Sequence, residues 1–197
     1  MAHTTQELVD FGPATATMAQ VLAGIDDRHL TGSTPCPAYT VADVIDDVAG
    51  LTVAFTAAAR KDPLAGHGPS GDGAQLQPGW RERITADLDV LAEAWRDRAS
   101  HEGFTMAGPI EMPARVAALV ALDELVVHAW DLARATGQPY TADPAAVAAC
   151  ASWVEGFQVP AEVSDGGPFG PAVPVPVDAP AIDRLVGLTG RNPAWTP

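Results

Sequence analysis

Apolar residues recur at helical spacing over most of this chain, and this periodicity constrains its fold more than any other feature. Stripes with steps of three and four residues run through four long segments, at about residues 4–25, 41–55, 79–98 and 113–137. Such spacing lines one face of an α-helix, whereas the alternation typical of strands is nearly absent. Because four amphipathic helices bury their stripes by packing together, we expect an all-α protein, an antiparallel four-helix bundle.

Capping signals indicate where these helices begin and end. Residues 4–7 have the form of a capping box for the first helix, and Pro13 is expected to kink that helix or delay its start. Thr40, with an aspartate three residues later, is predicted to cap the second helix. Pro113 suits the first turn of the fourth helix, and Gly137 ends it.

Segments rich in glycine, proline and aspartate separate the helices. Residues 61–78 are expected to form a mobile loop. Residues 99–112 are expected to be irregular, with one short extended piece around Phe104. His67 and His101 lie in these two loops, where histidines are usually exposed to solvent, although both loops could fold over a site.

A tail of different composition follows the fourth helix. Asp143 is predicted to cap a fifth helix over about residues 144–157, and a proline- and glycine-rich loop follows it. A short last helix is expected within residues 178–190. We therefore expect residues 1–137 to form the bundle and residues 138–197 to form an extension of two short additional C-terminal helices, packed on the same domain.

The charge of the chain limits its partners. The formal net charge is −14, the pI is near 4.4, and the 11 basic residues form no run, which argues against binding to nucleic acid.

The N-terminus does not resemble a secretory signal, and no apolar stretch is long enough to span a membrane. Two cysteines, Cys36 and Cys150, suit a reducing compartment. We expect a cytoplasmic protein, a monomer or homodimer, with a small-molecule substrate.

Three ionisable residues lie in the apolar run of the fourth helix. At about 100° per residue, Glu124, His128 and Asp131 project within about 60° of one another. Glu124 and His128 are either neighbours on a solvated face or two ligands of a divalent ion. Small and apolar residues share their side and favour an inward orientation, in which a charge must be paired or bound to metal: Ala117, Val120, Ala121, Val127 and Ala135.

Asp131 has two interpretations. It accepts a hydrogen bond from His128 and so supports the site, or it pairs with Arg134 on the helix surface. The surface pair is slightly favoured, because oppositely charged residues three positions apart on a helix often meet in this way.

The second helix offers three aspartates as a further ligand. Measured from the centre of its apolar stripe, Asp46 is nearly opposite, Asp43 is about 130° away and Asp47 is about 90° away. Asp47 is therefore the aspartate that can face the interior of the bundle. The alternative interpretation is that Asp47 is an ordinary carboxylate at the boundary with solvent.

Several segments resemble a known family. The sequence TPCPAYTVADVIDDVAG, at residues 34–50, resembles a segment of the DinB/YfiT-like superfamily, in the branch related to the N-terminal domain of mycothiol-dependent maleylpyruvate isomerases. ELVVHAWDLARATGQP, at residues 124–139, matches a motif of that branch nearly residue for residue. FGPAVPVP at 169–176 and IDRLVGLTGRNPAW at 182–195 are similar to its C-terminal signature.

The resemblance implies a metal-binding four-helix protein whose ligands are commonly histidine, glutamate and histidine. Glu124 and His128 occupy two of these ligand positions, and the first histidine of the family falls on Asp47, which is a departure. Because a carboxylate replaces an imidazole, harder ions such as Mn²⁺ or Mg²⁺ gain relative to Zn²⁺, the ion implied by the family, although Zn²⁺ or Ni²⁺ still wins if supplied.

Other residues of the resembling segments are expected to support the site or the fold. Tyr39 stands where the family usually has tryptophan, and Trp130, Asp131 and Arg134 belong to the motif of the fourth helix. The resemblance does not extend to the sterol-carrier-like C-terminal domain of the full isomerases, so we do not expect maleylpyruvate isomerase activity to transfer to this chain.

Two functions follow from these observations. The first is a metal-dependent enzyme of the thiol-dependent transferase or isomerase type, in which a divalent ion activates a low-molecular-weight thiol or water. The second is a small-molecule-binding or accessory protein with a degenerate metal site, which the aspartate at position 47 favours. Self-association through the apolar loop at residues 166–177 is compatible with both.

Overall fold

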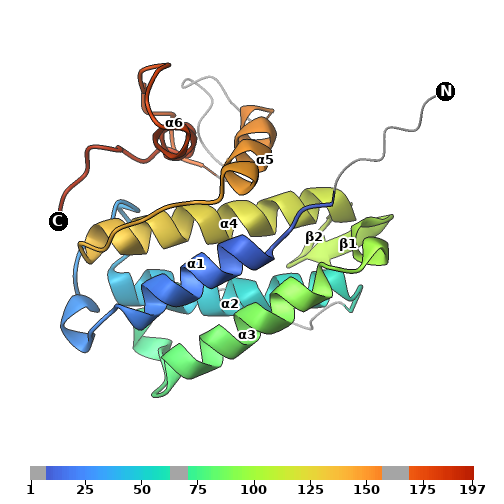
Figure 1. Ribbon diagram of the computed structural model, residues 1–197. Coiled ribbons are helices and arrows are strands. Elements are labelled where there is room, and N and C mark those ends of the chain that lie inside the picture. Colours follow the sequence, from blue (N-terminus) through green and yellow to red (C-terminus); the bar gives the residue numbers. More distant parts are fainter. Residues whose placement is uncertain (1–7, 63–70, 157–168) are drawn as a thin grey trace.

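The computed structural model describes residues 8–62, 71–156 and 169–197, and within them the chain forms six α-helices and one short hairpin. Four long helices form the bundle in Figure 1: α1 (Gly12–Ala23), α2 (Val41–Ala59), α3 (Trp80–Ala94) and α4 (Ala114–Ala135). Helix α1 packs against α3 and α4, and α2 packs against the same two helices. The prediction of an all-α helical bundle is confirmed.

Contacts between the helix ends show how the chain runs through the bundle. Lys61 Nζ donates to the carbonyl of Ser100 at 2.9 Å, so the ends of α2 and α3 lie together. Gln138 Nε2 donates to the carbonyl of Val21 at 3.0 Å, so the ends of α1 and α4 lie together at the opposite end (Figure 1). The α1–α3 and α2–α4 pairs are therefore antiparallel, while α2 runs parallel to α3 and α1 runs parallel to α4.

The cap of α2 also fixes the connection that leads to α3. Thr40 Oγ1 accepts from the amide of Asp43, and the Asp43 carboxylate accepts from the amide of Thr40 at 2.8 Å, which confirms the predicted cap. The same carboxylate accepts from the amide of Gly73 at 2.7 Å. This bond brings the connection back to the start of α2, and for this reason α3 runs parallel to α2.

The structure confirms the delayed start of α1 and corrects the end of α3. Helix α1 starts at Gly12, with Pro13 in its first turn, so the delayed start is confirmed; the predicted capping box at residues 4–7 lies outside the described residues. Helix α3 ends at Ala94 rather than near residue 98. A 3-10 helix, Arg98–His101, follows, because the Asp97 side chain accepts from the amide of Ala99 and starts a new turn there.

A two-stranded hairpin precedes α4. Strand β1 (Phe104–Ala107) pairs antiparallel with β2 (Ile110–Pro113), so the single extended piece expected around Phe104 was only half of the element. Gly108 has a φ of 59° in the two-residue turn, a conformation that glycine adopts without steric cost. Thr105 Oγ1 donates to the carbonyl of Ala58 at 2.6 Å, which ties the hairpin to the end of α2.

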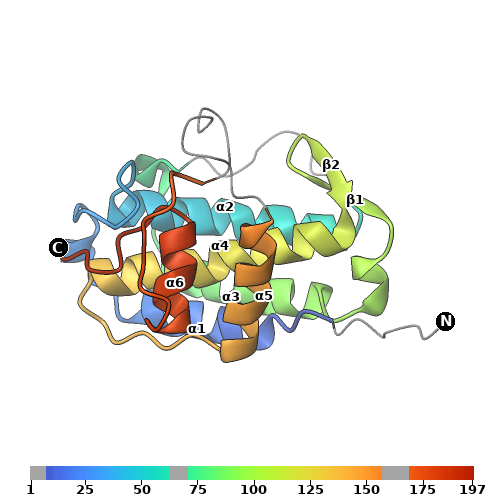
Figure 2. The ribbon, with the colours of Figure 1, turned by 90° about the horizontal axis from the view of Figure 1, so that it is seen from above.

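The last two helices lie outside the four-helix ring. Helix α5 (Pro144–Glu155) packs on α4, and α6 (Ala181–Leu188) packs beside α5 (Figure 2). The Asp143 side chain accepts from the amide of Ala146, which confirms the predicted cap of α5. The first part of the proline-rich loop, residues 157–168, lies outside the described residues. None of the helices described is both long and apolar enough to cross a membrane.

Candidate metal centre

Asp47, Glu124 and His128 meet between α2 and α4. His128 Nε2 lies 3.1 Å from the Glu124 carboxylate and 3.4 Å from the Asp47 carboxylate. One ligand atom from each residue lies within 4.8 Å of the other two. The structure thus brings together the three residues that the sequence predicts as ligands.

The donor set suits a divalent cation. Metal–ligand bonds of about 2 Å from imidazole nitrogen and carboxylate oxygen require donor atoms no more than about 4 Å apart, and small side-chain shifts achieve this here. One imidazole and two carboxylates, Asp47 and Glu124, make a hard, anionic set. The Asp47 side chain is 11% exposed and that of Glu124 is 32% exposed, so the group opens toward solvent beside Glu124.

Asp131 holds the other side of the His128 ring. The Asp131 side chain is fully buried, and its Oδ2 lies 3.1 Å from His128 Nδ1. A carboxylate at this position accepts the Nδ1 proton and leaves Nε2 to face Asp47 and Glu124. The first interpretation of Asp131, a hydrogen bond to His128, therefore describes its contact correctly.

The alternative pairing of Asp131 with Arg134 is wrong. Arg191, from the segment that follows α6, donates to Asp131 Oδ2 at 3.2 Å and supplies the cation that a buried carboxylate requires. Arg134 instead donates to the carbonyls of Pro193 and Trp195, at 2.9 and 3.2 Å. Both arginines thus join the C-terminal segment to α4.

Hydrogen bonding favours the protonated form of the His128 ring. Burial opposes the charged ring, but hydrogen bonds to Asp131, Asp47 and Glu124 outweigh burial and raise the pKa of His128 well above its usual value. A metal ion must displace the proton on Nε2, so metal binding to this group releases a proton and weakens as the pH falls.

The remaining aspartates of α2 face away from this group. Asp46 is half-buried and accepts from the amide of Asp72 at 3.2 Å, on the side of the 71–79 connection. Asp43 caps the helix, as described above. Of the loop histidines, His101 Nε2 lies 2.8 Å from the carbonyl of Trp95, away from the candidate ligands, and His67 lies outside the described residues.

The other three predicted supporting residues, Tyr39, Trp130 and Arg134, have clear contacts. Tyr39 lies near Asp47 and His128; burial first and then the Asp47 charge raise the pKa of its hydroxyl. Trp130 is buried in α4, and the guanidinium of Arg134 lies 5.7 Å from the centre of its ring. Tyr39 therefore borders the site, whereas Trp130 and Arg134 hold the helix and the C-terminal segment together.

Sequence reasoning missed three residues near the site. Arg191 gave no local signal, because it lies 60 residues after its partner Asp131. Cys36 is half-buried, and burial, partly opposed by the charge of Arg191, raises the pKa of its thiol. Asp123 faces Cys150 of α5; burial, aided by the neighbouring Glu124, raises the pKa of its carboxyl to about 8. Helical spacing could have identified Asp123 as an inward-facing acid.

Fold and site together define a helical bundle with a candidate metal centre between two antiparallel helices. The sequence model for the mycothiol maleylpyruvate isomerase N-terminal domain matches residues 11–133. The chain belongs to this family. The match contains all four bundle helices except the last two residues of α4, and it includes every residue of the candidate ligand group.

Relatives of known sequence match most of the chain. Two curated proteins of Mycobacterium tuberculosis strains, uncharacterized protein Rv0738 and uncharacterized protein MT0763, are each 30% identical over 179 residues. The match covers 88% of this chain and 91% of each relative.

Solved structures confirm the fold. Crystal structures of mycothiol-dependent maleylpyruvate isomerase and of a mutant of it superpose with a TM-score of 0.55, at 18% and 16% identity. The match covers 72% of this chain but only 65% of each isomerase chain. At this level of identity the likeness concerns the fold.

Proposed function

We propose that this protein is a divalent-metal-dependent enzyme of the thiol-dependent transferase or isomerase type, with Asp47, Glu124 and His128 as the ligands of the ion. The observation that carries the proposal is the convergence of these three side chains, with one ligand atom of each within 4.8 Å of the others. Membership in a family named after a mycothiol-dependent isomerase supports a small thiol as cosubstrate.

The surrounding residues have defined roles in this proposal. Asp131 accepts the Nδ1 proton of His128 and so keeps Nε2 directed toward the ion. Arg191 supplies a cationic partner to the buried Asp131 side chain. A bound divalent ion lowers the pKa of a coordinated thiol or water and provides a nucleophile at neutral pH. Glu124, the most exposed of the three ligands, borders the side from which a substrate reaches the site.

The second candidate is a binding or accessory protein with a degenerate metal site. Asp47 is the specific observation in its favour, because a second carboxylate neutralises more of the charge of the ion and reduces its power to acidify a thiol. The two candidates differ in whether the folded protein binds metal stoichiometrically and then binds a thiol.

Metal content tests the proposal. Protein purified without chelators and incubated with Zn²⁺ or Mn²⁺ is expected to retain close to one ion per chain after gel filtration, and His128→Ala is expected to lose it. His29→Ala is the matched control, because His29 lies outside the site and its Nδ1 only accepts from the amide of Asp26. Equal metal content in the wild type and His128→Ala would refute the ligand assignment.

Thiol binding then separates the two candidates. The loaded wild type is titrated with cysteine or mycothiol in a calorimeter, with the metal-free protein as reference. The enzyme proposal predicts binding that depends on the metal and releases protons. A stoichiometrically loaded protein that binds no thiol would favour the accessory function.

A further inference from the structure

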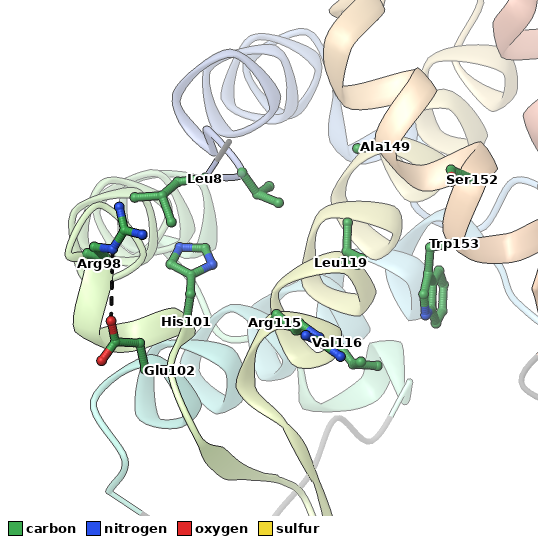
Figure 3. A pocket seen from close by; sticks show the side chains of 11 residues that line it. Leu8, Arg98, His101, Glu102, Arg115, Val116, Leu119, Ala149, Ser152 and Trp153 are labelled. Carbon is green, nitrogen blue, oxygen red and sulfur yellow. Dashed lines mark ion pairs between the residues drawn. The ribbon is translucent and has the colours of Figure 1, made fainter. Parts of the chain in front are cut away.

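A cavity lies on the face of α4 that points away from the candidate metal centre. It has a volume of about 520 Å³, within the usual range for small-molecule sites. Its walls come from the 3-10 helix Arg98–His101, the first turns of α4 and the second half of α5 (Figure 3). Arg115 and Leu119 line it, and they project from α4 at about 140° to 180° from Glu124. None of the candidate metal ligands borders this cavity.

The charge of this cavity is the reverse of the charge of the chain. The sequence has 25 acidic and 11 basic residues, yet the lining contains Arg98, Arg115 and His101 and a single carboxylate, Glu102. A cationic hollow on a strongly acidic protein attracts small anions that the rest of the surface repels. Charge therefore selects an anionic ligand for this cavity.

Among the described residues, neither arginine has a strong competing partner. The Arg98 guanidinium lies 3.9 Å from Glu102, and both side chains are exposed, so this ion pair is weak and exchanges readily. Arg115 is exposed and forms no ion pair or hydrogen bond with the described residues. The guanidinium group donates two parallel hydrogen bonds to a carboxylate or sulfonate, which makes arginine a favourable partner for such groups.

The opposite wall of the cavity is apolar. Figure 3 shows Arg98 and His101 on one side and Leu119 and Trp153 on the other, with Arg115 between them. Trp153 also packs edge-on against Phe169, 5.6 Å between ring centres, so it presents a fixed aromatic surface. A ligand with a charged head and an apolar body matches both walls at once.

We propose that this cavity binds a small organic monoanion, a carboxylate or sulfonate carried on an aromatic or branched apolar body. Arg115 holds the anionic head, Arg98 contributes a second cation when it leaves Glu102, and Leu119 and Trp153 contact the apolar body. The proposal is independent of the metal centre, because it uses none of the residues of that site.

Titration with 1-anilinonaphthalene-8-sulfonate, a fluorescent aromatic monoanion, tests the proposal. We expect saturable binding of about one probe at this cavity, and about tenfold weaker binding in Arg115→Gln, which corresponds to one charge-assisted contact. Arg184→Gln is the matched control, because Arg184 lines a different cavity of about 510 Å³ between α5 and α6. This control is expected to bind the probe like the wild type.

A second variant and a neutral probe distinguish an effect of charge on binding from a general loss of folding. Ser152 is an exposed helix residue in the wall, so Ser152→Glu adds a carboxylate there without disturbing the core. We expect it to lose the sulfonate probe while it retains the weaker binding of neutral N-phenyl-1-naphthylamine. Equal effects of Arg115→Gln and Arg184→Gln, or full retention of the anionic probe by Ser152→Glu, would overturn the proposal.

Discussion

The two antiparallel helix pairs of this bundle bury different kinds of side chain. The buried residues of α1 and α3 are apolar except for Thr15 and include no ionisable side chain, and where α1 begins and α3 ends the rings of Phe11 and Trp95 stack with 5.6 Å between their centres. Between α2 and α4, Asp47 and His128 are buried together, and Asp131 lies behind them with no exposed surface. Both pairs contribute to the apolar core, but the α2–α4 pair also buries the charged residues of the candidate site.

This difference has an energetic basis. Apolar burial stabilises the folded state wherever it occurs, whereas a buried charge is destabilising unless it has a partner. At the α2–α4 interface, His128 has three carboxylate partners and Asp131 has His128 and Arg191. Replacement of a buried charge network by well-packed apolar residues is often neutral or stabilising, so a stable fold does not by itself require the charged arrangement.

The largest effect on stability is expected in the apolar half. Trp95 is 1% exposed and stacks on Phe11, so Trp95→Ala should lower the free energy of unfolding by about 3–5 kcal/mol. Denaturant unfolding measures this loss, and Val90→Ala, at a 40% exposed position of α3, is the control with a change below about 0.5 kcal/mol. If Trp95→Ala protein that is still folded bound Zn²⁺ more weakly than the wild type, the α1–α3 contacts and the candidate metal site would not be independent of each other.

A somewhat smaller effect, of a different kind, is expected in the charged half. Arg191→Met removes the guanidinium partner of the buried Asp131 carboxylate and leaves it with His128, which should cost about 3 kcal/mol. Because the damage comes from a buried charge that has lost one partner, the double variant Asp131→Asn/Arg191→Met should recover much of this loss. Denaturation of the two single variants and the double variant gives the coupling energy; strictly additive losses would show that Arg191 does not act through Asp131.

The smallest effect concerns a charge near the surface. Hydrogen bonds from Thr40, first, and from the amide of Gly73 lower the pKa of the Asp43 carboxyl. A lowered folded pKa contributes stability above the unfolded value near 4, and this contribution is lost as the pH falls through the folded pKa. Asp43→Ala should therefore cost about 1 kcal/mol at pH 7. Its deficit relative to the wild type should shrink as the pH falls below about 4 and the carboxyl becomes protonated, and a deficit independent of pH would exclude the carboxylate as the cause.

Local sequence rules predicted most of the fold. Helical periodicity located the helices because each must bury one apolar stripe, and the caps at Thr40 and Asp143 follow from side chains that reach amides three residues away. The end of α3 was misplaced because Asp97 competes for the backbone and starts the following 3-10 helix. The hairpin was only half predicted, because four-residue strands carry too few positions to show alternation.

The candidate site was predictable only where helix geometry decides it. The position of Asp47 at the edge of its apolar stripe was sufficient to select it over Asp46. Of the two interpretations of Asp131, the contact with His128 was right and the favoured pairing with Arg134 was wrong, because spacing along a helix considers only neighbours on the same helix. Arg191 contacts Asp131 from a segment 60 residues further along the chain, and no rule based on local spacing predicts such a contact.

Calorimetric titration of the metal-free protein with Zn²⁺ tests most directly whether Asp47, Glu124 and His128 form a metal site. Imidazole suits Zn²⁺ better than a second carboxylate does, so Asp47→His is expected to bind Zn²⁺ at least about tenfold more tightly than the wild type. Mn²⁺, a harder ion, should lose affinity in the same variant. Equal Zn²⁺ affinity in the wild type and Asp47→His would show that Asp47 is not a ligand, and would contradict the metal centre proposed between α2 and α4.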